Sequence, residues 1–257
     1  MPLQELMAEI AANNAAISTL NQTIIENFYE GNEDYENSNY KEAINVFSDA
    51  MLSDEKLRKE ATDAFKVKYG TELNDGSTHI DWNKETQEAY LIERYGEEEA
   101  KNYRFRRGKL EHKEGDIWKA EEGKFDSKSA LQWLENEFVN DFILSNNDAI
   151  SYGNELGNKL KESGAFNFAG EDQDEIDAKQ GKFTAEYAKV LTALANGEEN
   201  VGLDLSGFTR DDIESIDVSK FEEGSNEREI IENAIASYDK ANAIANINES
   251  TKFTASV

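Results

Sequence analysis

The sequence contains no cysteine, one proline and only two histidines among its 257 residues. The absence of cysteine excludes disulfide bonds, thiolate ligands for zinc and a cysteine nucleophile. The two histidines, His79 and His112, lie in different segments, and neither has a second histidine at the spacing of a metal-binding motif. The sequence therefore predicts no metal site and no cofactor.

Recognisable catalytic motifs are also missing. The chain has no GxSxG motif, no glycine-rich phosphate loop and no dinucleotide fingerprint. The acidic stretches at residues 32–39 and 171–177 lack the glycine and glutamate spacing of an EF-hand. Because the chain holds 54 carboxylates, some pair always lies at glycosidase separation, and such a pair carries no information. We expect that the protein is not an enzyme, with a site assembled from scattered residues as an open alternative.

Long apolar runs are absent as well. No stretch reaches the roughly 18 apolar residues of a membrane-spanning helix. The first residues carry acids where a signal peptide carries lysines. We expect a protein without signal peptide or membrane association, which stays in the cytoplasm of the producing cell or forms part of a virus particle.

Basic residues are scarce: 27 lysines and arginines stand against 54 acids, for a net charge of −27. A chain of this charge repels phosphate groups, so we expect no direct, sequence-specific nucleic-acid binding. The charge is uneven, because residues 1–50 hold nine acids and one base, residues 51–128 hold 19 acids and 16 bases, and residues 129–257 hold 26 acids and ten bases. The middle of the chain is therefore nearly neutral.

A basic cluster lies in this middle region, where aromatic and basic residues alternate before a turn at Gly108. The alternation predicts a β-hairpin or ribbon. Guanidinium groups pair at two points with carboxylates, so we expect the cluster to bind an acidic protein surface. Two alternatives stay open: a solvated face whose arginines pair with residues 97–99, and a nucleic-acid patch. The candidate interaction residues are Tyr103, Arg104, Phe105, Arg106, Arg107 and Lys109.

The first helix has a narrow apolar seam, with spacings of three and four residues. This pattern is typical of a helix that packs against another helix, either in its own bundle or in a second chain. The candidate seam contacts are Leu3, Leu6, Ile10, Ile17, Leu20 and Ile24.

Helical periodicity recurs along most of the remaining sequence. Helices are predicted over residues 40–51, from an N-cap at Ser53 to about residue 69, and over residues 83–95. A further helix is predicted from residue 126 to a break at residues 146–147, and another from that break to Gly164. One more helix is predicted to end before Gly197, and the last to begin at about residue 225. Residues 73–81 are predicted to form a loop. The predicted fold class is mainly α: a single bundle-like helical domain over residues 1–257, with a small β-hairpin or ribbon inserted near residues 101–120. Its expected sub-regions are N-terminal helices at 1–100, the ribbon at 101–125 and acidic helices at 126–257.

These features favour a non-enzymatic structural or assembly protein, such as a subunit of a virus particle, a connector ring or a filament. Its expected partners are further copies of itself in a homo-oligomer or other assembly proteins. The alternative is an acidic DNA mimic or inhibitor that binds a basic partner protein. The charge density fits this alternative, and the arginine cluster argues against it.

Overall fold

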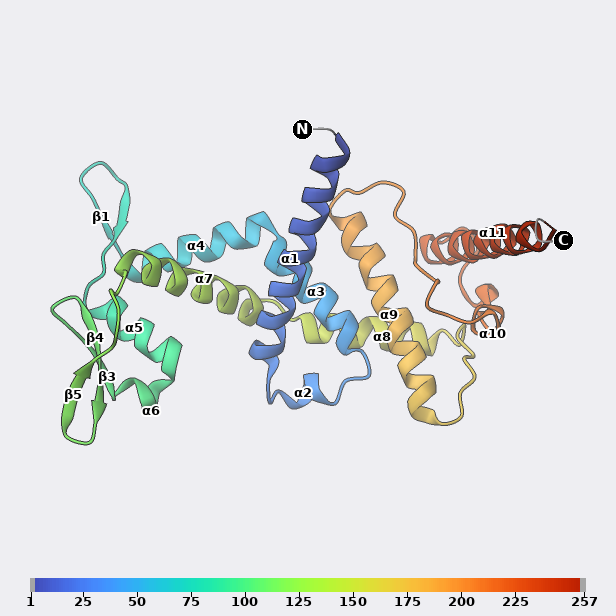
Figure 1. Cartoon of the computed structure of the whole chain (residues 1–257). Coiled ribbons are helices and arrows are strands. Elements are labelled where there is room, and N and C mark those ends of the chain that lie inside the picture. The colour runs from blue at the N-terminus through green and yellow to red at the C-terminus, as the bar shows by residue number, and fades with distance from the viewer. Residues whose placement is uncertain (1–2, 255–257) are drawn as a thin grey trace. The chain divides into compact units, whose positions relative to one another are not determined.

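The computed structural model describes the backbone of residues 3–254 and the side chains of residues 12–243. Over that range the chain is mainly helical and carries two small antiparallel sheets, which confirms the predicted fold class. The chain divides into two compact units. Figure 1 labels the helices α1 to α11 and the strands β1, β3, β4 and β5. Unit 1 comprises Met1–Ala50 and Asp148–Val257, and unit 2 comprises Met51–Asn147. That the chain is one domain stays a prediction.

Unit 1 contains the longest helices of the described chain. Its elements are α1 (Leu3–Tyr29), α2 (Glu33–Glu36), most of α3 (Lys41–Ser53), α8 (Ala149–Glu162), α9 (Gln173–Ala195), α10 (Arg210–Glu214), the short 3-10 helix η1 (Val218–Lys220) and α11 (Asn226–Thr254).

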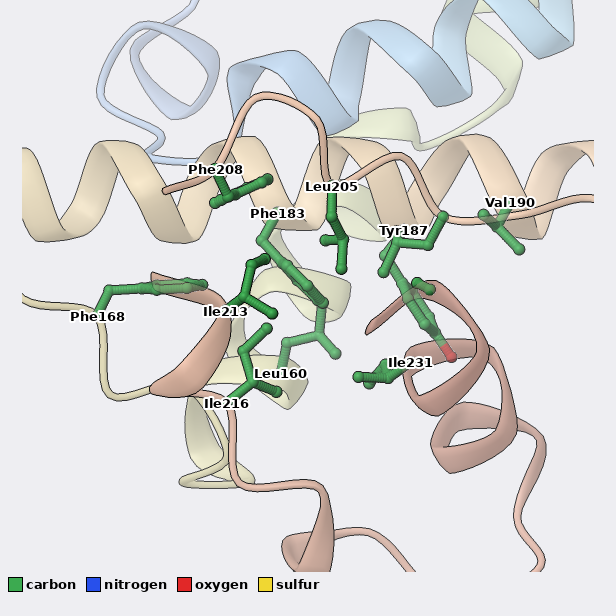
Figure 2. Close-up of a cluster of buried hydrophobic side chains, with 12 residues drawn as sticks. Leu160, Phe168, Phe183, Tyr187, Val190, Leu205, Phe208, Ile213, Ile216 and Ile231 are labelled. Carbon is green, nitrogen blue, oxygen red and sulfur yellow. The ribbon is translucent and has the colours of Figure 1, made fainter. Parts of the chain in front are cut away.

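The main core of unit 1 forms around α9 (Figure 2). Phe183, Tyr187 and Val190 recur at helical spacing on one face of α9, as predicted, and each is at most 3% exposed. The loop after α9 and the start of α11 cover this face with further apolar side chains, including Leu205 and Ile231. Burial of this cluster is the main source of stability in unit 1.

Unit 2 combines three long helices with both sheets. Its elements are α4 (Glu55–Tyr69), β1 (Gly70–Glu72), β2 (Thr78–Ile80), α5 (Lys84–Tyr95), α6 (Glu97–Ala100), β3 (Tyr103–Arg106), β4 (Lys109–Glu114), β5 (Ile117–Ala120) and α7 (Ser127–Asn146). Helix α7 packs along α4 and α5. The core between them contains Phe65, Tyr90 and Leu134, all less than 7% exposed.

Local capping residues set the ends of the helices in unit 2. Asn83 accepts hydrogen bonds from the backbone N–H groups of Glu85 and Thr86, and Asp126 accepts one from Lys128 at the start of α7. Ser53 was predicted to cap α4, and this is wrong. Ser53 ends α3, and the carboxylate of Asp54 accepts the Leu57 N–H at 2.8 Å.

The loop predicted over residues 73–81 is also partly wrong, because β1 and β2 form a hairpin there. Gly76 adopts a left-handed φ of 79°, and Asp75 accepts the Ser77 N–H, which together reverse the chain direction. Three-residue strands are too short to show an alternating pattern in the sequence. Their pairing became visible only in the structure.

Candidate basic interaction face

The predicted ribbon is a three-stranded antiparallel sheet in the order β3-β4-β5 (Figure 1). Arg107 and Gly108 form the two-residue turn between β3 and β4, with left-handed φ values of 53° and 73°. Such turns match the twist of the paired strands and fix their register. Arg104 therefore lies opposite Glu111, and Arg106 opposite Lys109.

One face of this sheet belongs to the core of unit 2. Tyr103, Phe105 and Leu110 share this face, and all three pack against the buried cluster. The Phe105 ring lies 5.2 Å from that of Trp82, and the Tyr103 ring stacks on Tyr95 at 3.9 Å. The structure thus places Tyr103 and Phe105 on the opposite side of the sheet from the arginines. We leave both aromatic residues out of the interaction face.

The other face collects basic side chains from adjacent strands. Residues directly opposite each other in a sheet share a face, so the register determines its members. We define the basic face as the basic residues and the tryptophan on this side of the sheet, together with Arg107 in the turn: Arg104, Arg106, Arg107, Lys109, Lys113 and Trp118. Glu111, opposite Arg104, is an acidic residue on the same side. Trp118 was not predicted as a member of this face, because only the pairing of Lys113 with Trp118 across β4 and β5 places it there.

Arg104 is held in place by neighbours within the sheet. Its Nε donates a hydrogen bond to Glu111 Oε2 at 2.7 Å, and its guanidinium lies 4.1 Å from the centre of the Trp118 ring. The Glu111 side chain is only 15% exposed, which reduces the screening of this pair by water. Arg104 is therefore preorganised on the basic face.

The remaining cations of the basic face have no partner among the side chains of residues 12–243. Arg106, Arg107, Lys109 and Lys113 are all exposed, and among the described side chains none of them forms a hydrogen bond or ion pair. Arg106 and Lys109 also face each other across the strands as a like-charged pair, which costs stability. The alternative in which arginines pair with residues 97–99 is not found, since in the described chain only Lys101 pairs there, with Glu98.

The rest of the chain supplies a strong charge contrast. Unit 2 contains 22 acids and 16 bases, a net charge of −6, whereas unit 1 contains 32 acids and 11 bases, a net charge of −21. The basic face is therefore a local positive patch on a strongly acidic protein. Such a patch attracts carboxylates at short range.

Both histidines contact carboxylates, His79 at Asp81 and His112 at Glu114 and Glu121. His112 lies between two carboxylates, with Nε2 2.9 Å from Glu114 Oε1 and Nδ1 2.6 Å from Glu121 Oε1. The hydrogen bond with Glu114 and the charge of Glu121 raise the pKa of His112 above its ordinary value, against a smaller effect of desolvation. Within the described residues, no three histidine or carboxylate side chains gather at metal-binding distances.

The described residues of the apolar seam of α1 differ in their exposure to solvent. Ile17 is 53% exposed and Leu20 is 61% exposed, while Ile24 is half-buried. A neighbouring face of α1 enters the core instead, through Ile25 and Tyr29. The other seam residues, Leu3, Leu6 and Ile10, have side chains outside the described residues. Packing of this seam against another chain stays a prediction.

No described helix is both long enough and apolar enough to cross a membrane. Comparison of the sequence and the structure with known protein families, with characterised proteins and with solved structures finds no significant match.

Proposed function

We propose that this protein is a non-enzymatic assembly subunit that joins its neighbours through the basic face. The observation that carries the proposal is a set of four exposed cations that have no partner in the described part of the chain, on a sheet whose other face packs against a core. A rigid sheet loses little conformational entropy on binding, and an arginine guanidinium matches a carboxylate at two points.

An acidic protein surface is the partner that suits this face best. The net charge of −27 opposes the approach of a phosphate backbone, and its field extends over about 10 Å at 0.1 M salt. Carboxylates are abundant on the chain itself, so a second copy offers the required surface. A contact between unlike patches continues from copy to copy and builds a ring or a filament. A subunit of a virus particle, a connector ring or a filament fits this arrangement.

The exposed part of the α1 seam supports a second contact between copies. Ile17 and Leu20 are large apolar side chains on one face of a long helix, and both are mainly exposed to water. Covering them with a helix of a neighbouring chain would remove this apolar surface from water.

The high negative charge of unit 1 favours one alternative function, an acidic inhibitor that binds a basic protein. This alternative predicts salt-sensitive capture of a DNA-binding protein, and it does not require the basic face. Charge reversal of the basic face therefore distinguishes the two functions, because only the assembly function depends on this face.

The proposal is tested by measuring the mass of the purified protein by light scattering after size exclusion, at about 50 and about 500 mM salt, which span weak and strong screening. We expect a defined multiple of 29.0 kDa at low salt. The variant Arg106→Glu with Lys109→Glu should be a monomer.

A matched control carries Lys56→Glu and Lys159→Glu, whose lysine side chains are 85% and 72% exposed. It changes the net charge equally and should assemble like the parent chain. A parent chain of 29.0 kDa at both salt concentrations, or a basic-face variant with unchanged mass, would overturn the proposal.

A further inference from the structure

Unit 2 also contains an apolar groove with an acidic rim, formed by α5, α7 and the end of α4. Its volume is about 570 Å³. The apolar lining residues are Tyr69, Ala89, Ile92, Leu134, Phe138 and Phe142. The acidic lining residues are Glu85, Glu88, Glu93 and Asp141. The groove thus offers both aromatic surface and negative charge to a ligand.

Two of the rim carboxylates form no direct ion pair within the described chain. Among the described side chains, neither Glu93 nor Asp141 forms an ion pair or a hydrogen bond. Both residues are exposed, but desolvation by neighbouring groups raises the pKa of each carboxyl. The charge of Asp141 raises the pKa of Glu93 further, and the charge of Lys68 lowers it. Glu137 lies close enough to both that their charges also raise its pKa, after the larger effect of burial. An added cation would relieve this repulsion.

The groove already accommodates one cation over its aromatic floor. The Lys68 ammonium lies 5.0 Å from the centre of the Tyr69 ring and 5.3 Å from that of Phe138. These distances are within the range of cation–π attraction, and arginine binds aromatic faces in the same way. The chemistry of the groove therefore suits a narrow basic segment.

We propose that the β3–β4 turn of a second copy, residues 106–109, docks into this groove. The inference rests on the proposed function and names the partner surface of the basic face. The turn carries Arg106, Arg107 and Lys109, which form no ion pair with any described side chain, and the acidic residues of the groove outnumber its one lysine, Lys68, so the two surfaces are complementary in charge. Paired strands lie only about 4.8 Å apart, so a two-residue turn is a narrow element suited to a groove.

The contact is heterologous, because it joins the turn of one copy to a different surface of the next. In an open assembly, the copy at one end has a free turn and the copy at the other end has a free groove. The assembly therefore grows until it closes as a ring or continues as a filament. The groove and the turn both belong to unit 2.

A charge-swap experiment tests this docking. The turn-reversed chain carries Arg106→Glu and Lys109→Glu, and the groove-reversed chain carries Glu93→Lys and Asp141→Lys. Each reversal should weaken self-association by about 100-fold or more and leave a monomer, because it places like charges in contact. An equimolar mixture should assemble again, since the acidic turn fits the basic groove and the basic turn fits the acidic groove.

Controls for folding and for net charge are available in unit 2. All three tryptophans, Trp82, Trp118 and Trp133, lie in this unit, so tryptophan fluorescence reports whether it is folded in each variant. Reversal of two exposed acids outside the groove, Glu60→Lys with Glu122→Lys, should leave assembly unchanged.

The outcomes separate the docking inference from the proposed function. A folded groove-reversed chain that assembles like the parent overturns the docking inference, while loss of assembly in the turn-reversed chain still supports the proposed function. A mixture that stays monomeric also overturns the docking inference. A parent chain that never assembles overturns both.

Discussion

Replacing Lys109 with glutamate should stabilise the protein while removing part of its binding surface. Lys109 faces Arg106 directly across the β3–β4 ladder, and both side chains are exposed and form no ion pair or hydrogen bond with the described residues. The substitution turns a repulsive cross-strand pair into an attractive one. It therefore separates the role of the basic face in binding from any role in folding.

The size of the effect follows from Coulomb's law. Two unit charges about 7 Å apart in water interact with about 0.6 kcal/mol, so reversing one charge changes the pair energy by about 1.2 kcal/mol. Screening over a Debye length of about 10 Å at 0.1 M salt reduces this to about 0.6 kcal/mol. At 1 M salt, where the Debye length is about 3 Å, the gain falls to about 0.1 kcal/mol.

Urea unfolding followed by tryptophan fluorescence measures this gain, at a protein concentration where light scattering shows a monomer. With a slope of about 1–3 kcal/mol per molar urea, the midpoint at 0.1 M salt should rise by about 0.2–0.6 M. The fluorescence reports on unit 2, which contains all three tryptophans and the sheet itself.

The matched control is Lys113→Glu, which changes the net charge equally but lies opposite Trp118 instead of a cation. It should not show the gain. The reasoning is refuted if Lys109→Glu is no more stable than Lys113→Glu, or if its gain is the same in 1 M salt.

Substitutions at three further positions test the fold. Phe183→Ala removes a fully buried ring from unit 1 and should lower the free energy of unfolding by about 3–5 kcal/mol, measured by far-UV circular dichroism in urea. Asn83→Ala removes the cap of α5 and should cost about 1 kcal/mol by tryptophan fluorescence, while Asn83→Asp keeps an acceptor and should cost less. His112→Gln tests the ion pairs of His112 with Glu114 and Glu121. Because the pKa of His112 is raised in the folded protein, these pairs stabilise the fold fully below the ordinary histidine pKa of 6.5. This stabilisation is lost as pH rises through the raised pKa. The variant should therefore be less stable than the parent at pH 6 and equally stable at pH 9; equal stability at both pH values would contradict this pairing.

The helices and the ribbon were predictable because their signals are local. The start of α5 depends on Asn83 and the next three residues, and the apolar residues on one face of α9 recur three or four positions apart. The cluster of basic residues near residue 106 was equally plain in the sequence, as was the alternation that indicated strands. Each of these features depends on residues only a few positions apart.

The candidate sites depended on contacts between distant segments. Strand register decided that Arg104 pairs with Glu111 while Arg106 faces another cation. Alternation along the strand places Phe105 and the arginines on opposite faces, and packing on the core decided that the face of Phe105 is the buried one. The groove exists because α4, α5 and α7 meet. It brings together Glu93 of α5 and Asp141 of α7, two helices between which the strands β3, β4 and β5 lie in the sequence. Local sequence sets helix and turn propensities, whereas only the close packing of the core selects which surfaces are left to face solvent.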